Sequence, residues 1–329
     1  MRRHKFYIVV TIQGVSRAHF RRRKARCSRG GWVDTIGRLA LLMSGPRIYL
    51  GTSAFTAAGW AGSFYPAGMK AGEYLSFYAE HFDTVEIDST YYGTPKASTV
   101  AGWERKTPAH FLFSVKAPQV ITHEKVLEGC EAEWDEFVRT MDLLGEKLGP
   151  IVLQFPFFDS YAFRDGKEFL ARLRPFLERL PADHKFAVEI RNKEWLDQRL
   201  AELLRQHRVA LVMQDQSWMP NAEELESRFD PVTADWTYIR WLGDRKGIER
   251  TTKVWNRTVV DRGPQLRSWV EFCRRVQHRG ATIFAYANNH YAGHAPATIA
   301  RFIELWREAG LPEIAQPRRE RPASTLFEL

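Results

Sequence analysis

A repeating pattern of short apolar segments and helical segments runs through most of this chain. Eight times between Ile48 and about Ala309, a β-branched or aromatic run ends in a polar or charged residue and is followed by a stretch with helical periodicity. Strands that alternate with helices of crossover length are parallel, and eight such units close into a barrel more naturally than they stay open. The sequence therefore predicts a single-domain α/β protein, a (β/α)8 barrel of the TIM type.

The predicted strands are short, and segments with helical periodicity separate most of them. The strands span residues 48–51, 84–87, 111–116, 151–154, 185–189, 210–213, 236–240 and 283–287. The helical patterns span residues 72–81, 98–106, 132–148, 166–180, 195–207, 264–279 and 297–309. The connection between residues 216 and 235 contains proline and is only weakly helical.

The excess positive charge of the chain is concentrated at its beginning. Residues 1–42 hold 11 of the 48 Lys and Arg but only one acid, Asp34, which leaves 37 basic against 38 acidic residues elsewhere. The net charge of +9 therefore argues for nucleic-acid binding by this leader alone. Charge runs without apolar periodicity seldom fold. We predict a basic leader at 1–42, disordered or translated from a misplaced start, with an Arg-rich transit peptide as the alternative. A barrel domain at 43–312 and a tail at 313–329 follow.

Cysteine usage and hydropathy bear on the compartment. The three cysteines, Cys27, Cys130 and Cys273, are far apart and odd in number, so they indicate neither a disulfide framework nor a zinc site. No apolar stretch approaches the roughly 18 residues that a membrane-spanning helix needs. We therefore expect a protein of the cytoplasm with no membrane partner.

A polar or charged residue lies at or just past the end of every predicted strand, whereas neighbours of opposite parity, such as Val85, Val115 and Val188, are apolar. These polar residues are Ser53, Glu86, Lys116, Gln154, Glu189, Asp215, Arg240 and Asn288. Side chains of one parity face one side of a strand, and the loops at the carboxyl ends of barrel strands build active sites. The sequence therefore predicts a polar mouth.

Several ordered segments resemble a known family. They read YLGTS at 49–53, VEIDSTYY at 85–92, FSVKAP at 113–118, ITH at 121–123, LQFP at 153–156, AVEIR at 187–191 and NNHYAGHAP at 288–296. These segments resemble the YecE-like family, TIM-barrel proteins catalogued as a domain of unknown function. The resemblance covers about residues 46 to 310. It implies the barrel fold and supplies little chemistry.

Two carboxylates and three cations stand out at the predicted mouth. Glu86 and Glu189 end the second and fifth strands, so a ligand between them could meet an acid and a base. Lys116, Arg191 and Arg240 flank them as electrostatic clamps. We predict Glu86, Lys116 and Glu189 as catalytic groups. The alternative is that carboxylates and cations pair only to neutralise one another. The residues predicted to bind substrate around them are Ser53, Asp88, Tyr91, His123, Gln154, Arg191, Asp215 and Arg240.

The segment after the eighth strand has the composition of an anion-binding loop. It leads into a helix with Pro296 near its first turn, and such helix N-termini commonly hold phosphate in barrels. Gly293 would let the backbone approach an anion. The connection 244–262 adds six Lys and Arg against three acids. The groups predicted to donate to the anion are Asn288, Asn289, His290 and His294.

Two further chemistries are compatible with these residues. Lys116 could form a Schiff base if desolvated, although the nearby carboxylates are expected to raise its pKa. His290 and His294 lie four residues apart, a spacing that binds metal on a helix, but Gly293 and Pro296 indicate a loop. With His123, Glu86, Glu189 and Asp215 they could form a zinc or manganese site. There is no dense ligand motif, so no metal or other cofactor is assigned.

These observations predict an enzyme that acts on a small anionic, phosphate-bearing substrate by acid/base chemistry, as a hydrolase, isomerase or lyase. The alternative is a nucleic-acid-binding or nuclease-like barrel, possibly metal-dependent, which would use the basic connection 244–262 and the aromatic first loop at 54–70. The aromatic residues of that loop are Phe55, Trp60, Phe64 and Tyr65. Such residues more often form a packed wall than a base-stacking platform.

Overall fold

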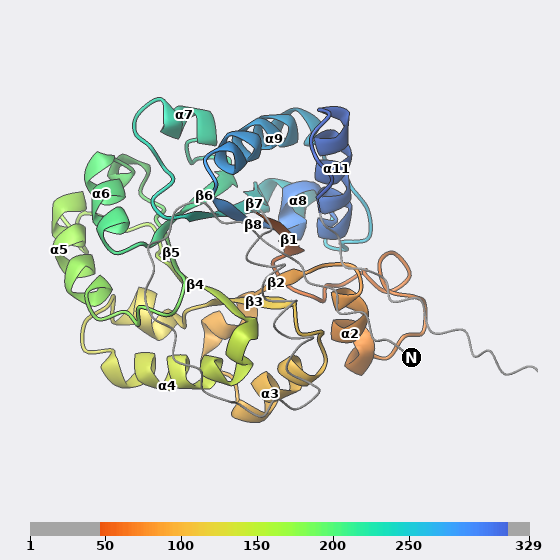
Figure 1. Cartoon of the computed structure of the whole chain (residues 1–329), viewed down its shortest axis with the longest axis horizontal. Coiled ribbons are helices and arrows are strands. Elements are labelled where there is room, and N and C mark those ends of the chain that lie inside the picture. The colour runs from red at the N-terminus through yellow and green to blue at the C-terminus, as the bar shows by residue number, and fades with distance from the viewer. Residues whose placement is uncertain (1–46, 315–329) are drawn as a thin grey trace, which may run out of the picture. The chain divides into compact units, whose positions relative to one another are not determined.

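Eight parallel strands stand at the centre of the described part of the chain, and helices surround them (Figure 1). The structure is a computed structural model that describes residues 47–314. The strands are β1 (Ile48–Thr52), β2 (Thr84–Ile87), β3 (Leu112–Lys116), β4 (Leu148–Gln154), β5 (Phe186–Glu189), β6 (Ala210–Gln216), β7 (Trp236–Gly243) and β8 (Thr282–Ala287). Their hydrogen-bonded order is β1-β8-β7-β6-β5-β4-β3-β2. The predicted TIM-type barrel is confirmed as one domain. The predicted leader at 1–42 and most of the predicted tail lie outside the described residues.

The connections contain the helices that cover the barrel. They are η1 (Ala71–Glu73), α2 (Tyr74–Ala79), η2 (Asp88–Tyr92), α3 (Ala97–Arg105), η3 (Val120–Glu124), α4 (Glu131–Met141), η4 (Asp142–Lys147), α5 (Gly166–Leu177), η5 (Lys193–Trp195), α6 (Gln198–Gln206), α7 (Ala222–Glu226), α8 (Arg245–Thr251), α9 (Gly263–His278), α10 (Asn289–Ala292) and α11 (Ala295–Glu308). Asp165 and Asp197 begin α5 and α6, since their carboxylates accept hydrogen bonds from free N–H groups of the first turn. Within residues 47–314, no helix has the length and apolar character needed to cross a bilayer.

Some predicted boundaries differ from the structure. Strands β6 and β7 each continue three residues beyond their predicted ends. The predicted helix 132–148 ends as an α-helix at Met141, and Gly145, with a φ of 55°, interrupts the turn that follows. The segment after β8, predicted as a loop, contains the single helical turn α10, which Asn288 caps.

Two apolar layers follow from the alternation of side chains along the strands. Residues of one parity fill the barrel interior, and residues of the other parity pack against the helices. The interior cluster consists of Val152, Ala187, Ala210, Val212, Trp236, Tyr238, Phe284 and Tyr286. Cys130 and Cys273 are buried, unpaired thiols in the outer layer. The next interior positions toward the carboxyl ends are the polar ones that form the candidate site.

Strands β1 and β2 meet at a seam. Every other neighbouring pair of strands shares a main-chain ladder, whereas within residues 47–314 these two do not. The hydroxyl of Tyr78 from α2 spans the seam: it accepts a hydrogen bond from the N–H of Thr52 (2.9 Å) and donates to the carbonyl of Thr84 (3.2 Å). Gly51 allows the close approach, because a Cβ there would lie 2.2 Å from the carbonyl oxygen of Thr84.

Candidate active site

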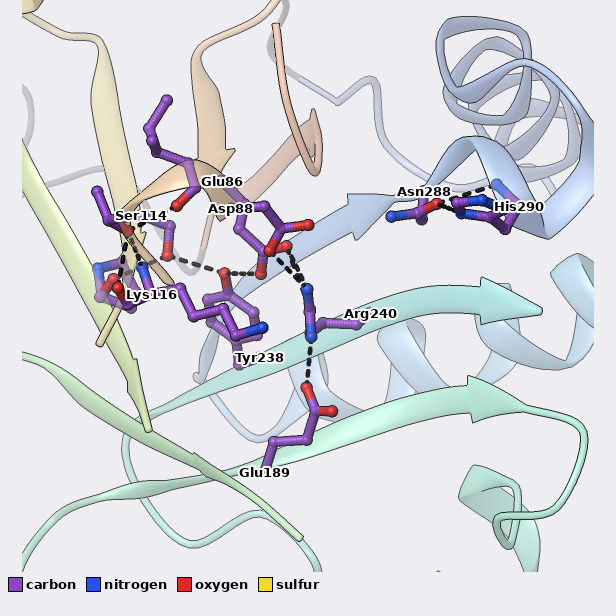
Figure 2. A network of polar contacts seen from close by, with 12 residues as sticks. Glu86, Asp88, Ser114, Lys116, Glu189, Tyr238, Arg240, Asn288 and His290 are labelled. Atoms are coloured by element: carbon purple, nitrogen blue, oxygen red, sulfur yellow. Dashed lines mark hydrogen bonds and ion pairs between the residues drawn. The ribbon is translucent and has the colours of Figure 1, made fainter. Parts of the chain in front are cut away.

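Arg240 is the centre of a buried charged cluster inside the mouth of the barrel (Figure 2). Its side chain, on β7, is 3% exposed. Its Nη1 donates to Oε2 of Glu189 (2.6 Å), and its Nη2 donates to Oε1 of Glu86 (2.7 Å) and to Oδ1 of Asp88 (3.1 Å). Its Nε also donates to Oε1 of Glu86 (3.2 Å). One guanidinium therefore joins carboxylates from the ends of three elements.

Two interior residues that the sequence analysis missed complete the contacts of Glu86. The hydroxyl of Tyr238 donates to Oε2 of Glu86 (2.7 Å), and Ser114 lies 2.8 Å from the same hydroxyl. Alternation along the strands could have identified both residues as inward-facing, since Tyr238 is two residues before Arg240 and Ser114 is two residues before Lys116. Neither was predicted, because the search considered only the strand ends, and these residues lie one inward position deeper in the barrel.

Glu189 is a fully buried carboxylate held by two arginines. Besides Arg240, the Nε and Nη2 of Arg191 lie 3.1 Å and 3.0 Å from its Oε1. Burial alone would raise the pKa of Glu189, but Arg240 and Arg191 outweigh burial and lower it to about 2. The space between Glu86 and Glu189, where the sequence analysis placed a ligand, is occupied by the Arg240 guanidinium. These contacts favour the alternative that Glu86 and Glu189 act as counter-ions.

We expect Glu189→Gln to lower the free energy of unfolding by about 3 kcal/mol at pH 7, because it leaves Arg240 and Arg191 with one carboxylate fewer. The pKa of Glu189 is depressed in the folded protein, so its contribution is present above its ordinary value of 4.5 and is lost as the pH falls toward about 2. Urea unfolding at neutral and acid pH measures this difference. Unchanged stability with turnover reduced by about 10² to 10⁴ would instead identify Glu189 as an acid or base.

Asp88 is the accessible carboxylate of the cluster. Its side chain is 34% exposed, and its one ion pair within residues 47–314 is the 3.1 Å contact with Arg240. Partial removal from water and the neighbouring Glu86 raise its pKa to about 6, against the opposing effect of Arg240 and Lys116. Asp88 can therefore take up or release a proton near neutral pH.

Lys116 is a half-buried lysine without an ionic partner. Its Nζ lies 4.0 Å from the centre of the Tyr91 ring, a cation–π contact. Within the described residues it makes neither a hydrogen bond nor an ion pair through Nζ, because Arg240 engages all three neighbouring carboxylates. Burial and Arg240 lower the pKa of Lys116, and they outweigh the three neighbouring carboxylates, which act in the expected direction and raise it.

Tyr91 and His123 border Lys116. Tyr91 belongs to η2, directly after β2, and His123 belongs to η3, a π-helical turn after β3. Their rings meet edge to face at 5.0 Å. Burial, assisted by Lys116 and Arg191, lowers the pKa of His123 to about 4, so this imidazole is neutral at pH 7. The structure thus brings these two predicted residues together with the charged cluster.

The segment predicted to bind an anion forms a separate network, and Figure 2 shows Asn288 and His290 apart from Arg240. The Nδ1 of His290 lies 2.6 Å from Oδ1 of Asn288, and its Nε2 lies 3.0 Å from Oε1 of Glu249. Oδ1 of Asn289 accepts from Trp60 (3.1 Å) and from the N–H of Ala295 (3.0 Å). These side chains are engaged in holding the connections together.

Gly293 serves packing rather than an anion. A Cβ at Gly293, whose φ is +108°, would lie 2.6 Å from the carbonyl oxygen of Arg257 and 2.9 Å from Val259. Residues 257–259 of the connection after β7 therefore occupy the space beside Gly293 that was predicted to hold an anion. His294 begins α11 and is buried, and its Nε2 has no hydrogen-bond partner in the described structure.

Asp215 faces the helices instead of the mouth. Its Oδ2 accepts from Nε1 of Trp269 (2.8 Å) and from the hydroxyl of Tyr291 (2.7 Å). The predicted placement was wrong because β6 extends to Gln216, which makes Gln214 the inward residue, in register with Arg240. Gln214 was missed, although it has the parity of Val212.

Ser53 and Gln154 are buried at the ends of β1 and β4 but lie outside the ion-pair cluster. The Oγ of Ser53 has no hydrogen-bond partner in the described structure. The Nε2 of Gln154 donates to the carbonyl of Phe155 (2.8 Å), and Gln154 pairs in register with Glu189. Both line the mouth without an ionic contact.

The alternatives of metal and stacking sites can be compared with the geometry. Among residues 47–314, no three His, Cys, Asp or Glu side chains are grouped so that they could hold a metal ion. The predicted donors His123, His290 and Asp215 belong to three different networks. In the first loop, Trp60 and Tyr65 are each 1% exposed and pack against Phe64. These aromatics form a wall, so the first loop offers no stacking platform.

The fold and the site define a TIM-barrel protein with a buried ion-pair cluster at the mouth of the barrel. Beside this cluster stands a lysine that has no ionic partner within the described part of the chain. Residues 49–322 match the family described as "Protein of unknown function DUF72". The chain belongs to this family.

Known relatives agree with this assignment. The chain is 32% identical over 273 residues to the UPF0759 protein YecE of Escherichia coli (strain K12), covering 77% of this chain and 92% of YecE. It is 32% identical over 281 residues to the UPF0759 protein YunF of Bacillus subtilis (strain 168), covering 78% of this chain and 94% of YunF. The crystal structure of a DUF72 family protein from Thermotoga maritima is 26% identical and superimposes with a TM-score of 0.63, covering 80% of this chain and 98% of that one.

Proposed function

We propose that this protein is an enzyme that binds a small anionic, phosphate-bearing substrate at the mouth of the barrel and acts on it by proton transfer. The observation that carries the proposal is the ammonium group of Lys116, which has no anionic partner among residues 47–314 although three carboxylates lie near it. A charge that is removed from water without a partner is unfavourable. Such a group persists at sites where a ligand supplies the partner.

The charges of the site respond to such a ligand. Three cations, Arg191, Arg240 and Lys116, face three carboxylates, Glu86, Asp88 and Glu189. An anion bound at Lys116 adds negative charge, which favours the protonated form of Asp88. Binding therefore couples to proton uptake, and it places an acid beside the ligand.

The roles within the site follow from these contacts. Lys116 and Arg191 bind the anion, and Asp88 exchanges the proton with the substrate. Glu86 and Glu189 hold the Arg240 guanidinium, which fixes the position of Asp88. Hydrolases, isomerases and lyases that act on phosphate-bearing compounds can all use such a proton transfer.

We expect sulfate to bind the full chain with proton uptake near pH 6, because sulfate itself does not titrate there. Lys116→Met should weaken binding by at least about tenfold, the usual size of one lost charge-assisted contact. Lys116→Arg should retain part of it. Calorimetry in buffers that differ in ionisation enthalpy measures both affinity and proton uptake.

Lys185→Met is the matched control for this experiment. Lys185 also lies over an aromatic ring, Trp236 at 6.0 Å, but it is exposed and directly precedes β5, at the opposite end of the strand from Glu189. Its replacement should leave sulfate binding unchanged. The stability of Lys116→Met should equal or exceed that of the wild type, because an unpaired charge is removed. Wild-type affinity for sulfate in Lys116→Met would refute the proposal.

A further inference from the structure

An aromatic shelf leads from the unpaired lysine to the outside of the barrel. Its members are Tyr91, Tyr92 and His123. The ring of Tyr91 lies 4.0 Å below the Nζ of Lys116, and the ring of Tyr92 meets Tyr91 edge to face at 5.2 Å. Tyr92 is 79% exposed. The shelf thus joins a buried positive charge to an open aromatic face.

The exposure of Tyr92 belongs to a wider pattern at the same end of the barrel. Six large hydrophobic side chains are exposed in the described structure. Five of them lie after the carboxyl end of a strand and before the last helix of the connection: Tyr92, Phe157, Tyr161, Trp218 and Val254. The sixth, Leu143, lies between α4 and the start of β4, at the opposite end of the barrel. Loops at the carboxyl ends of barrel strands build binding sites, so exposed apolar side chains in these loops are available to a ligand at the mouth. Exposed apolar side chains are therefore present at the end of the barrel where Lys116 lies.

We propose that the substrate of the proposed site is a nucleotide, whose phosphate meets Lys116 while its base stacks on Tyr92. This inference rests on the proposed function and names its substrate class. Lys116 Nζ and the centre of the Tyr92 ring are no farther apart than the two steps of 4.0 Å and 5.2 Å together. A mononucleotide spans this separation between phosphate and base.

The chemistry of the shelf suits a nucleobase. Every nucleobase has a π-face, and stacking on an exposed aromatic side chain needs no sequence-specific hydrogen bonds. His123 is neutral at pH 7 because burial lowers its pKa to about 4, so the shelf carries no second cation that would draw the phosphate away from Lys116. The phosphate and the base are therefore directed to different ends of the shelf.

The test compares two ligands that differ only in the base: adenosine 5′-monophosphate and ribose 5-phosphate. The full chain should bind the nucleotide more tightly, by roughly fivefold to 150-fold, the contribution of one stacked base. Tyr92→Ala should remove this advantage and leave the affinity for ribose 5-phosphate unchanged. Tyr92→Phe should retain it, because the ring is kept. Titration calorimetry gives each affinity.

Tyr161→Ala is the matched control, since Tyr161 is 99% exposed and follows β4 rather than β2. It should leave both affinities unchanged. Equal affinity of the wild type for the two ligands, or equal weakening of both by Tyr92→Ala, would overturn the nucleotide assignment while Lys116-dependent binding of ribose 5-phosphate still supported the proposed function. A single-stranded oligonucleotide that binds more tightly than the mononucleotide, with steep salt dependence, would also overturn it.

Discussion

Replacing Arg240 with methionine is expected to lower the free energy of unfolding by about 3–5 kcal/mol, the usual result of removing one partner from a buried ion pair. The substitution leaves Glu86 and Glu189, which are 1% and 0% exposed, without the guanidinium that lies between them. Two like charges would then share a water-poor interior. Urea unfolding at pH 7 measures the loss.

The control for this prediction is Arg279→Met. Arg279 also binds a carboxylate with two nitrogens, Asp230 at 2.9 Å and 2.6 Å, but both side chains are more than two fifths exposed. An exposed pair of this kind contributes less than about 1 kcal/mol. Equal losses in the two variants would show that burial of the Arg240 cluster does not carry the effect. Lower pH should partly rescue Arg240→Met, because protonation removes the uncompensated negative charge.

Replacing Asp88 with asparagine is expected to reduce turnover by about 10² to 10⁴, the usual contribution of a positioned acid or base. Asparagine keeps the shape of the side chain and an oxygen that can accept from Arg240, so folding should change little. Because Asp88 acts as the acid in its protonated form, kcat/KM of the wild type should fall on the alkaline side with an apparent pKa near 6, the value to which burial and Glu86 raise the pKa of Asp88. The variant should lack this limb.

Asp215→Asn is the control for Asp88→Asn. It shows whether the loss of any carboxylate near a strand end has the same effect on turnover. Asp215 faces the helices and is held by Trp269 and Tyr291, so its replacement should leave the alkaline limb of the pH profile in place. The profile is measured with the phosphate-bearing compound whose turnover depends on Lys116. Carbon NMR of the Asp88 carboxyl group gives its pKa without a substrate. A carboxyl that titrates near its ordinary value of 3.8, or an Asp88→Asn enzyme with wild-type turnover, would contradict the assignment.

The sequence was sufficient to predict the barrel and the inward direction of most strand ends. Both follow from local rules, the alternation of strands with helices and the parity of Glu86, Lys116, Glu189 and Arg240 along their strands. Parity failed at Asp215, because the end of β6 was placed three residues too early. A strand end chosen by composition alone can select the wrong face.

The partners of the charged side chains could not be predicted in the same way. Arg240 is long enough to reach Glu86 across the barrel as well as Glu189, and which carboxylates it engages depends on the packing of the interior. Because Arg240 binds all three carboxylates, Lys116 has no ionic partner within the described residues. The engagement of Asn289 likewise depends on Trp60 of the first loop, and that of His290 depends on Glu249 in the connection after β7. Such contacts between distant segments leave no periodic trace in a sequence.

The seam between β1 and β2 has a mechanical consequence. A row of main-chain hydrogen bonds resists sliding of one strand past the next, and this seam has the hydroxyl of Tyr78 in place of such a row. Within residues 47–314, β1 and β2 each have a ladder on one side only, so they are the strands most free to shift along the seam. Strand β2 carries Glu86 and leads into Asp88, the two residues that Arg240 binds from β7. The Arg240 guanidinium therefore ties the end of β2 to β7 and β5 by hydrogen bonds, in addition to the ladder that β2 shares with β3. A ligand that competes for Arg240 would weaken its hydrogen bonds to Glu86 and Asp88 and allow β2 to shift.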